Sequence, residues 1–300
     1  MRLDGRLARV RVRVRVRATV GTDSVSGTIL GMDGALGDDD GVYGPADRSG
    51  GAPGGVVSGS CPFTIERPTM TQRWAELTFV HWAFDPAVVS RLVPAHLRVE
   101  VLDGAAWVGL VPFRMHVATA GGREFRPVTT FCETNVRTYV VDAEGRPGVW
   151  FLSLDASRLG AVVVARARFA LPYFWASMSL TRSGDEIDYR CRRRAPRPAA
   201  AESRLRVRVG APLTAAELGP REHSLTARWR MFSSARGRHR RAEVWHQPWP
   251  LHRADLLDVD DHLLTAAGLP QPTGAPLVHY SPGVNVRIGP QRPCSGGLRS

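Results

Sequence analysis

From Trp74 onward the chain consists of short segments patterned for β-strands, and this succession restricts the fold more than any other feature. In the first segment Leu77, Phe79 and His81 alternate with other residues at the period of a strand. The pair Asp103-Gly104 separates two further β-rich runs and favours a tight hairpin turn, and a second hairpin is expected to join 132–141 to 149–155 across a turn at 142–147. The sequence therefore predicts a chain of consecutive, mostly antiparallel strands.

The same alternation and the positions of turn residues predict the other strands. They are expected at 99–102, 106–115, 132–141, 149–155, 165–169, 176–181, 187–192, 205–209, 228–233 and 243–246. A short helix is expected after Asp85-Pro86, which can cap and begin it, and leucine spacing predicts a longer helix at 254–267. So many strands and so few helices predict a mainly β fold (β-rich α+β), an antiparallel barrel or closed sheet.

The first 69 residues differ from the rest in composition. They are rich in Gly, Asp and Ser without periodic order, a composition that favours disorder. We expect a disordered, low-complexity extension at 1–69, with Met70 as a candidate natural start, although the Arg/Val alternation at 9–17 also suits an edge strand. A single domain is expected at 70–290 and a disordered tail at 291–300.

The net charge of +12 is concentrated in one segment, because residues 182–253 contain seventeen Arg and seven acidic residues. In 205–209 arginine alternates with aliphatic residues, which places the arginines on one face of a strand. A solvated outer face explains this pattern, and a surface for polyanions or acidic lipids is the alternative. Aromatic residues are not interleaved with the arginines, so we expect no specific nucleic-acid binding.

Several functional classes lack their sequence signatures. The four cysteines show no CxxC spacing, and neither a signal peptide nor an apolar run long enough to span a membrane is present, which favours a cytoplasmic protein. The histidines form no HExxH motif, so we expect no metal site. No GxGxxG or GxSxG motif occurs, so we expect no dinucleotide cofactor and no serine hydrolase. A homo-oligomer is compatible with the sequence.

The segment 132–140 carries the most chemically diverse side chains. In a strand Glu133, Asn135, Arg137 and Tyr139 lie on one face at intervals of about 6.8 Å. If this face points outward, the strand is half-exposed and the acid and guanidinium pair in solvent. If it points into a barrel, the four groups are candidates for orienting a ligand in an apolar cavity. The apolar run at 149–154 suggests burial on both faces and favours the cavity.

No lysine occurs in the 300 residues, so all forty basic residues of the Lys and Arg class are arginines. A guanidinium stays protonated and does not act as a nucleophilic amine. Catalysis through a lysine Schiff base is therefore excluded for this chain.

An ordered series of motifs resembles the YqjF-like family, a bacterial domain of unknown function in the acetoacetate decarboxylase-like superfamily. The match extends over about 74–290. The motifs are Trp82 with Asp85-Pro86, GAAWVG at 104–109, Pro112-Phe113, ExNVRTYV at 133–140, GVWFxSLDA at 148–156, Ala165-Arg166, LPY at 171–173 and HxPWPL at 246–251. The resemblance implies a β-barrel or cone around a central cavity.

In the decarboxylases of that superfamily, a segment similar to 166–173 carries the imine-forming lysine directly after a proline. This chain keeps the proline and has Tyr173 at the position of the lysine, while Glu133 resembles a buried glutamate about forty residues upstream. The resemblance therefore implies the fold without decarboxylation through an imine.

Two functional hypotheses remain for the cavity. In the first, it binds a small anionic carbonyl compound, with Asn135, Arg137, Tyr139 and Arg166 as ligand-binding residues. In the second, the protein is a lysine-independent lyase or isomerase in which Glu133, its pKa raised by burial, and the phenol of Tyr173 are the catalytic residues. A buried ion pair between the glutamate and an arginine, with a purely structural role, is the alternative to both.

Overall fold

The fold was analysed in a computed structural model that describes residues 58–118, 130–196, 201–235 and 237–294. These described residues all fall within one compact unit. They contain a sheet whose strands are β1 (Met70–Phe84), β2 (Leu97–Val99), β3 (Val101–Leu102), β4 (Ala105–Ala118), β5 (Thr130–Asp142), β6 (Pro147–Ala156), β7 (Tyr173–Ser183), β8 (Glu186–Ala195), β9 (Glu202–Pro212), β10 (Arg230–Ala235), β11 (Arg238–His246), β12 (His252–Asp261), β13 (Leu277–Ile288) and β14 (Arg292–Pro293).

The helices of the described residues are short. They are α1 (Pro86–Ser90), α3 (Leu159–Phe169), α4 (Pro220–Thr226), α5 (Leu263–Ala266) and the 3-10 helix η1 (Ala215–Glu217). The Asp85 carboxylate accepts a hydrogen bond from the Ala87 amide and Pro86 occupies the first turn of α1, which confirms the predicted cap. A mainly β fold with few short helices is thus confirmed.

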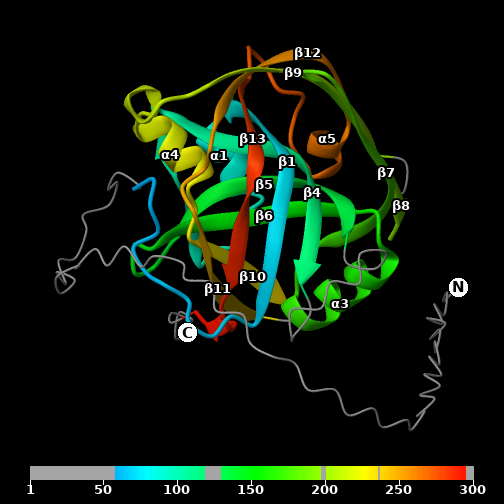
Figure 1. The fold of residues 1–300 in the computed structure, drawn as a ribbon. Helices are drawn as coiled ribbons and strands as arrows, with labels where there is room; N and C mark the ends of the chain where they lie inside the picture. The colour runs from blue at the N-terminus through cyan, green and yellow to red at the C-terminus, as the bar shows by residue number, and fades with distance from the viewer. Residues whose placement is uncertain (1–57, 119–129, 197–200, 236, 295–300) are drawn as a thin grey trace, which may run out of the picture. The chain divides into compact units, whose positions relative to one another are not determined.

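The strands form a ring, because β1, β4, β5, β6, β10, β11 and β13 pair in sequence and β13 pairs again with β1. A second ring branches from it through β7, β8, β9 and β12, which connect β6 to β13 on the other side (Figure 1). Strands β13, β1, β4, β5 and β6 belong to both rings. Most pairings are antiparallel, as predicted, but β6 runs parallel to β7 and β10.

The shared strands are apolar on both faces because each face packs into a different core. In β1, Leu77 and Phe79 contribute to the core inside the first ring, and Val80 and Trp82 contribute to the core inside the second. In β4 the neighbouring residues divide between the two cores in the same way. Burial on both faces explains why these strands read as nearly continuous apolar runs.

Both predicted hairpins are confirmed. β3 and β4 pair across Asp103-Gly104, where both residues have positive φ angles of 53° and 76°. β5 and β6 pair across the second predicted turn, which positions 133–141 against 147–156. This second hairpin holds the polar face of β5 in place.

The helix predicted at 254–267 is wrong over most of its length, since residues 252–261 form β12 and only Leu263–Ala266 are helical. Here the acidic residues Asp255 and Asp258 lie opposite Arg208 and Arg206 of β9 in the sheet register. Pairing with a strand about fifty residues earlier in the chain decides the structure, and local leucine spacing does not reveal it.

The strand predicted at 165–169 is also wrong, because these residues end helix α3. The parallel arrangement of β6 and β7 requires a crossover connection, and a helix is its usual form. Alanine and arginine have high helix propensity, so this segment suits that role.

Residues 58–69 belong to the segment predicted to be disordered, and the structure places part of it against the sheet. Ile65 is buried, and Cys61 and Phe63 pack against Ala227 and Trp229. Residues 1–57 and 295–300 lie outside the described residues, so their disorder remains a prediction.

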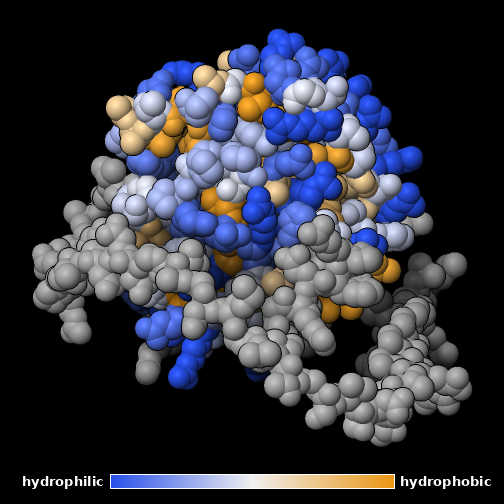
Figure 2. Space-filling view, viewed as in Figure 1, coloured by the Kyte–Doolittle hydropathy of each residue, from blue (hydrophilic) through white to orange (hydrophobic). Residues whose placement is uncertain are grey.

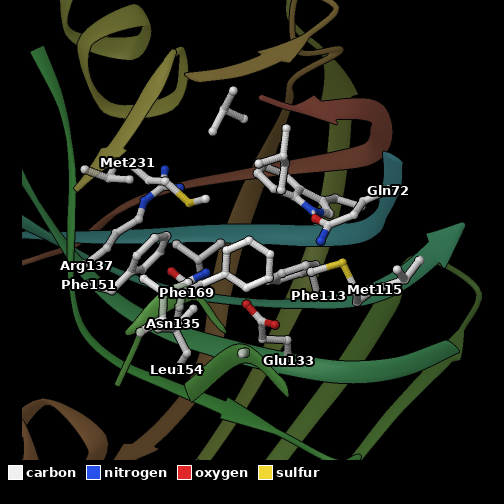
Figure 3. A pocket seen from close by; sticks show the side chains of 18 of the residues that line it. Gln72, Phe113, Met115, Glu133, Asn135, Arg137, Phe151, Leu154, Phe169 and Met231 are labelled. Atoms are coloured by element: carbon white, nitrogen blue, oxygen red, sulfur yellow. Dashed lines mark hydrogen bonds between the residues drawn. The ribbon is translucent and has the colours of Figure 1, made fainter. Parts of the chain in front are cut away.

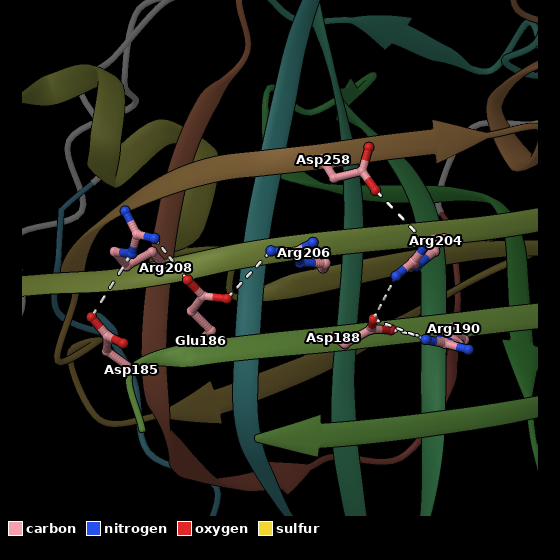
Figure 4. Close-up of polar contacts among 8 residues, drawn as sticks. All are labelled: Asp185, Glu186, Asp188, Arg190, Arg204, Arg206, Arg208 and Asp258. Carbon is pink, nitrogen blue, oxygen red and sulfur yellow. Dashed lines mark hydrogen bonds and ion pairs between the residues drawn. The ribbon is translucent and has the colours of Figure 1, made fainter. Parts of the chain in front are cut away.

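Five arginines of β8 and β9 pair with acids at the protein surface, namely Arg190, Arg192, Arg204, Arg206 and Arg208. Arg208 contacts Glu186 at 2.7 Å, Arg190 contacts Asp188 at 2.8 Å, and further pairs link these strands to β12 (Figure 4). Hydrophilic residues cover the top and right of the face in Figure 2, where these strands lie. Their pairing favours the solvated outer face over a polyanion surface.

Candidate functional site

The first ring encloses a cavity of about 330 Å³ beneath helix α3. Its wall is mostly apolar and is formed by side chains from β1, β4, β6, helix α3 and the segment after β11. The set includes Trp74, Leu77, Phe113, Met115, Phe151, Leu154, Phe169 and Trp249. A small number of polar groups in an apolar cavity is typical of a binding site for a small molecule.

Glu133 points into this cavity from β5 (Figure 3) and is 2% exposed. Burial raises the pKa of its carboxyl group from 4.5 to about 8, against hydrogen bonds from Tyr173 and Asn135 that favour the carboxylate. Asp155 lies close enough to raise this pKa further. The described residues contain no ion pair to Glu133, so the alternative of a buried glutamate–arginine pair is not observed.

Tyr173 begins β7, directly after the crossover through α3. Its hydroxyl donates a hydrogen bond of 2.8 Å to Oε2 of Glu133. Burial and the neighbouring carboxylate raise the pKa of Tyr173 well above its usual value, so the phenol remains protonated and serves as a donor. The two residues that sequence analysis assigned to catalysis therefore form one hydrogen-bonded pair in the cavity.

Asn135 and Arg137 follow on the same face of β5 and also line the cavity. Arg137 is 6% exposed, and its guanidinium donates to the Leu225 carbonyl at 3.0 Å and to the Tyr139 hydroxyl at 3.3 Å. Within the described residues, no carboxylate lies within salt-bridge distance of Arg137. Its positive charge is therefore available to an anionic ligand.

Tyr139 is buried behind the cavity wall rather than in it. Its hydroxyl donates to the Leu225 carbonyl at 2.5 Å and accepts from Nε2 of His81 at 2.5 Å. It supports Arg137, which makes a hydrogen bond to the same hydroxyl.

Arg166 lies outside the cavity, on the exposed side of α3, and lines a separate surface pocket. Its guanidinium donates to the backbone carbonyl of Tyr173 at 2.6 Å. The structure thus brings Glu133, Asn135, Arg137 and Tyr173 together and separates Arg166 from them.

Sequence analysis did not place Arg228, Arg230, His246 or Trp249 in the cavity, which they line. Arg228 pairs with Glu100 at 2.7 Å. The HxPWPL motif at 246–251 contains His246 and Trp249 and was the available signal for these two residues. Burial lowers the pKa of His246 to about 4, so its imidazole is neutral near pH 7.

Within the described parts of the chain, no three His, Cys, Asp or Glu side chains are grouped so as to hold a metal ion. No helix there has the length and apolar character that crossing a membrane requires. The groups present are suited to binding an anion and to moving a proton, through Arg137 and through the pair of Glu133 and Tyr173.

Residues 71–285 match the family DUF2071, described as an uncharacterized conserved protein. The chain is 35% identical over 227 residues to the uncharacterized protein YqjF of Bacillus subtilis (strain 168), a match that covers 74% of this chain and 91% of that protein.

Solved structures with a similar fold include the enduracididine biosynthesis enzyme MppR, with a TM-score of 0.57, 16% identity, and coverage of 82% of this chain and 98% of that one. An acetoacetate decarboxylase-like enzyme from Sphingomonas wittichii RW1 has a TM-score of 0.53 and 15% identity, and the match covers 79% of this chain and 100% of that one. Acetoacetate decarboxylase from Legionella pneumophila has a TM-score of 0.51 and 12% identity, and the match covers 79% of this chain and 93% of that one. The chain belongs to the DUF2071 family, together with YqjF, and has the acetoacetate decarboxylase-like fold.

Proposed function

We propose that the cavity binds a small organic acid that contains a carbonyl group, and that Glu133 exchanges a proton with it. The observation that carries this proposal is the hydrogen bond from Tyr173 to Glu133 inside an apolar cavity, with no ion pair to the carboxyl group among the described residues. A carboxyl group with a pKa of about 8 is suited to accepting and returning a proton near neutral pH.

The step we propose is enolisation. The carboxylate of Glu133 removes a proton from the carbon next to the ligand carbonyl. The electron pair of the C–H bond forms the C=C bond of the enolate, and the π pair of the carbonyl moves to its oxygen. The proton on the Glu133 carboxyl group exchanges with solvent water, and the enolate carbon then takes a proton from that carboxyl group. The phenol of Tyr173 stays protonated and, by donating to Glu133, stabilises the carboxylate that begins the step.

Arg137 supports the choice of an anionic ligand. Its guanidinium is buried and donates to one carbonyl and one hydroxyl, neither of which neutralises its charge. A carboxylate on the ligand would neutralise this positive charge and could bind in the bidentate geometry that guanidinium favours.

The fold is compatible with such a ligand in another protein. MppR has been solved in complex with pyruvate and with the condensation product of pyruvate and imidazole 4-carboxaldehyde. This chain contains no lysine to form an imine, so the proposed step involves none. Four free cysteines support a location in the reducing cytoplasm.

The test is exchange of carbon-bound hydrogen in deuterated water. The protein is incubated with pyruvate, 2-oxobutanoate and 2-oxohexanoate, and the loss of the C3 proton signal is followed by NMR. We expect exchange above the buffer rate, rising with pH to about 8 and then levelling off, because the carboxylate of Glu133 is the active form.

Glu133→Gln should abolish the enzyme-dependent exchange, and Tyr173→Phe should reduce it and move its pH midpoint upward, since a hydrogen bond that favours the carboxylate is lost. Glu202→Gln, at an exposed ion pair on β9, is the matched control and should exchange like the wild type. Equal exchange by the wild type and Glu133→Gln would show that Glu133 is not the base.

A further inference from the structure

The amide of Asn135 contains a polar atom without a partner inside the cavity. The residue is 5% exposed and its side chain points into the cavity from β5, between Glu133 and Arg137 (Figure 3). Its Oδ1 atom is buried and accepts no hydrogen bond from any described residue. Buried polar atoms in folded proteins are nearly always paired, so an unpaired one that faces a cavity indicates a missing donor.

The other end of the same amide lies toward Glu133. The Asn135 side chain lowers the pKa of the Glu133 carboxyl group by acting as a hydrogen-bond donor, a role that only its N–H group can fill. The amide therefore presents Oδ1, an acceptor without any hydrogen, to the remaining space. Of the side chains labelled near it in Figure 3, Phe151, Leu154 and Phe169 carry no donor, and the Arg137 guanidinium donates to Tyr139 and Leu225.

His246 contributes a second acceptor to the same wall. Its Nδ1 lies 2.6 Å from the Gln247 carbonyl oxygen, a contact that requires the hydrogen on Nδ1. In the neutral imidazole the other ring nitrogen, Nε2, is then an acceptor. The ring lines the cavity next to Trp249. Asn135 and His246 thus both present hydrogen-bond acceptors to the cavity.

We infer that the ligand carries a hydroxyl or N–H group which donates to Oδ1 of Asn135, and that this residue selects hydroxylated or amino-bearing acids over their unsubstituted parents. The inference rests on the proposed binding of an organic acid. It names the substrate class more closely, because Asn135 lies between the proton-transfer pair and the cationic end of the cavity. A site built to pair with a ligand hydroxyl discriminates against the analogue that lacks it.

The experiment compares acids that differ by one hydroxyl. Binding of hexanoate, 2-hydroxyhexanoate, 3-hydroxyhexanoate, 3-phenylpropanoate and 3-phenyllactate is measured by calorimetry and by ligand-observed NMR. The wild type should bind at least one hydroxylated acid about fivefold or more tightly than its parent, which is the lower end expected for an unpaired buried acceptor.

Asn135→Leu replaces the amide with an apolar group of similar size and should bring this ratio to about one while binding of the parent acid persists. Asn135→Val, which suits a strand, is the second variant if the first does not fold. Glu202→Gln, at an exposed ion pair on β9, is the control and should retain the wild-type ratio.

The outcomes separate the two proposals. Equal affinity of the wild type for hydroxylated and parent acids would overturn the selection while leaving acid binding intact. A preference that survives in Asn135→Leu or Asn135→Val would show that another group makes the contact. Binding of none of the five acids would overturn the selection, while the deuterium exchange of the 2-oxo acids tests the proposed acid site separately.

Discussion

Replacing Glu133 with glutamine should make the protein more stable, by an amount that depends on pH. In the folded protein the pKa of Glu133 is about 8, compared with 4.5 for an ordinary glutamate. Between these values the unfolded chain has released the proton and the folded chain has kept it. The wild type therefore loses stability as pH rises through this window, and the loss is complete above the folded-state pKa.

The magnitude follows from the distance between the two values, about 3.5 pH units, at about 1.4 kcal/mol each. The free energy of unfolding of the wild type therefore falls by about 5 kcal/mol once the pH is above 8, and by about 3 kcal/mol at pH 7, relative to its value below pH 4.5. Glutamine does not titrate, and its carbonyl oxygen can still accept the hydrogen bond from Tyr173. The difference between the two proteins should thus change by this amount while other titrating groups cancel.

The assay is urea denaturation of both proteins from pH 4 to pH 9, followed by tryptophan fluorescence. The free energy of unfolding of Glu133→Gln minus that of the wild type should rise by about 1.4 kcal/mol per pH unit between about 4.5 and 8 and stay flat outside this range. Glu202→Gln, on the exposed surface, should show no such slope. A pH-independent difference for Glu133→Gln would refute the burial argument.

Two further predictions concern stability. Arg193 holds the buried carboxylate of Asp155 through two hydrogen bonds of 2.8 Å, so Arg193→Leu should lower the free energy of unfolding by about 3–5 kcal/mol in urea denaturation. Gly283 has a φ of 126°, and an added Cβ would overlap the backbone of Trp74, so Gly283→Ala should lower the melting temperature or prevent folding.

Each has a control. Replacing both members of the ion pair, Arg193→Leu with Asp155→Leu, should recover part of the lost stability, because no unpaired charge remains buried. Gly145→Ala, at a φ of 75° with no atom within 4 Å of the added Cβ, should cost less than Gly283→Ala. A loss below about 1 kcal/mol for Arg193→Leu alone, measured against the 3–5 kcal/mol expected, would show that the pair is not essential.

Local pattern was sufficient for most strands and both hairpins. The turn at Asp103-Gly104 and the cap at Asp85 depend on interactions within a few residues, and both were predicted. The two errors, at 165–169 and 254–267, lie where the structure depends on partners distant in sequence. The first segment crosses between parallel strands, and the second pairs with the arginine-bearing β9.

Some residues of the candidate site could be predicted from local sequence, and others could not. Alternation along β5 placed Glu133, Asn135 and Arg137 on one face, and the resemblance to the decarboxylases drew attention to Tyr173. Neither indicated that His246 joins them, since β11 reaches this cavity only through pairings with β10 and β13.

The sequence by itself determined that this is a β-rich chain, that its β5 strand has a polar face and that no lysine is available for an imine. Strand periodicity and composition are local properties, so they can be read directly. Only the tertiary structure decided that the polar face points inward, that Glu133 contacts Tyr173 in the cavity, and that Arg166 lies outside it. Closing a ring from strands far apart in sequence creates the cavity and removes water from Glu133, and that desolvation gives the carboxyl group its raised pKa.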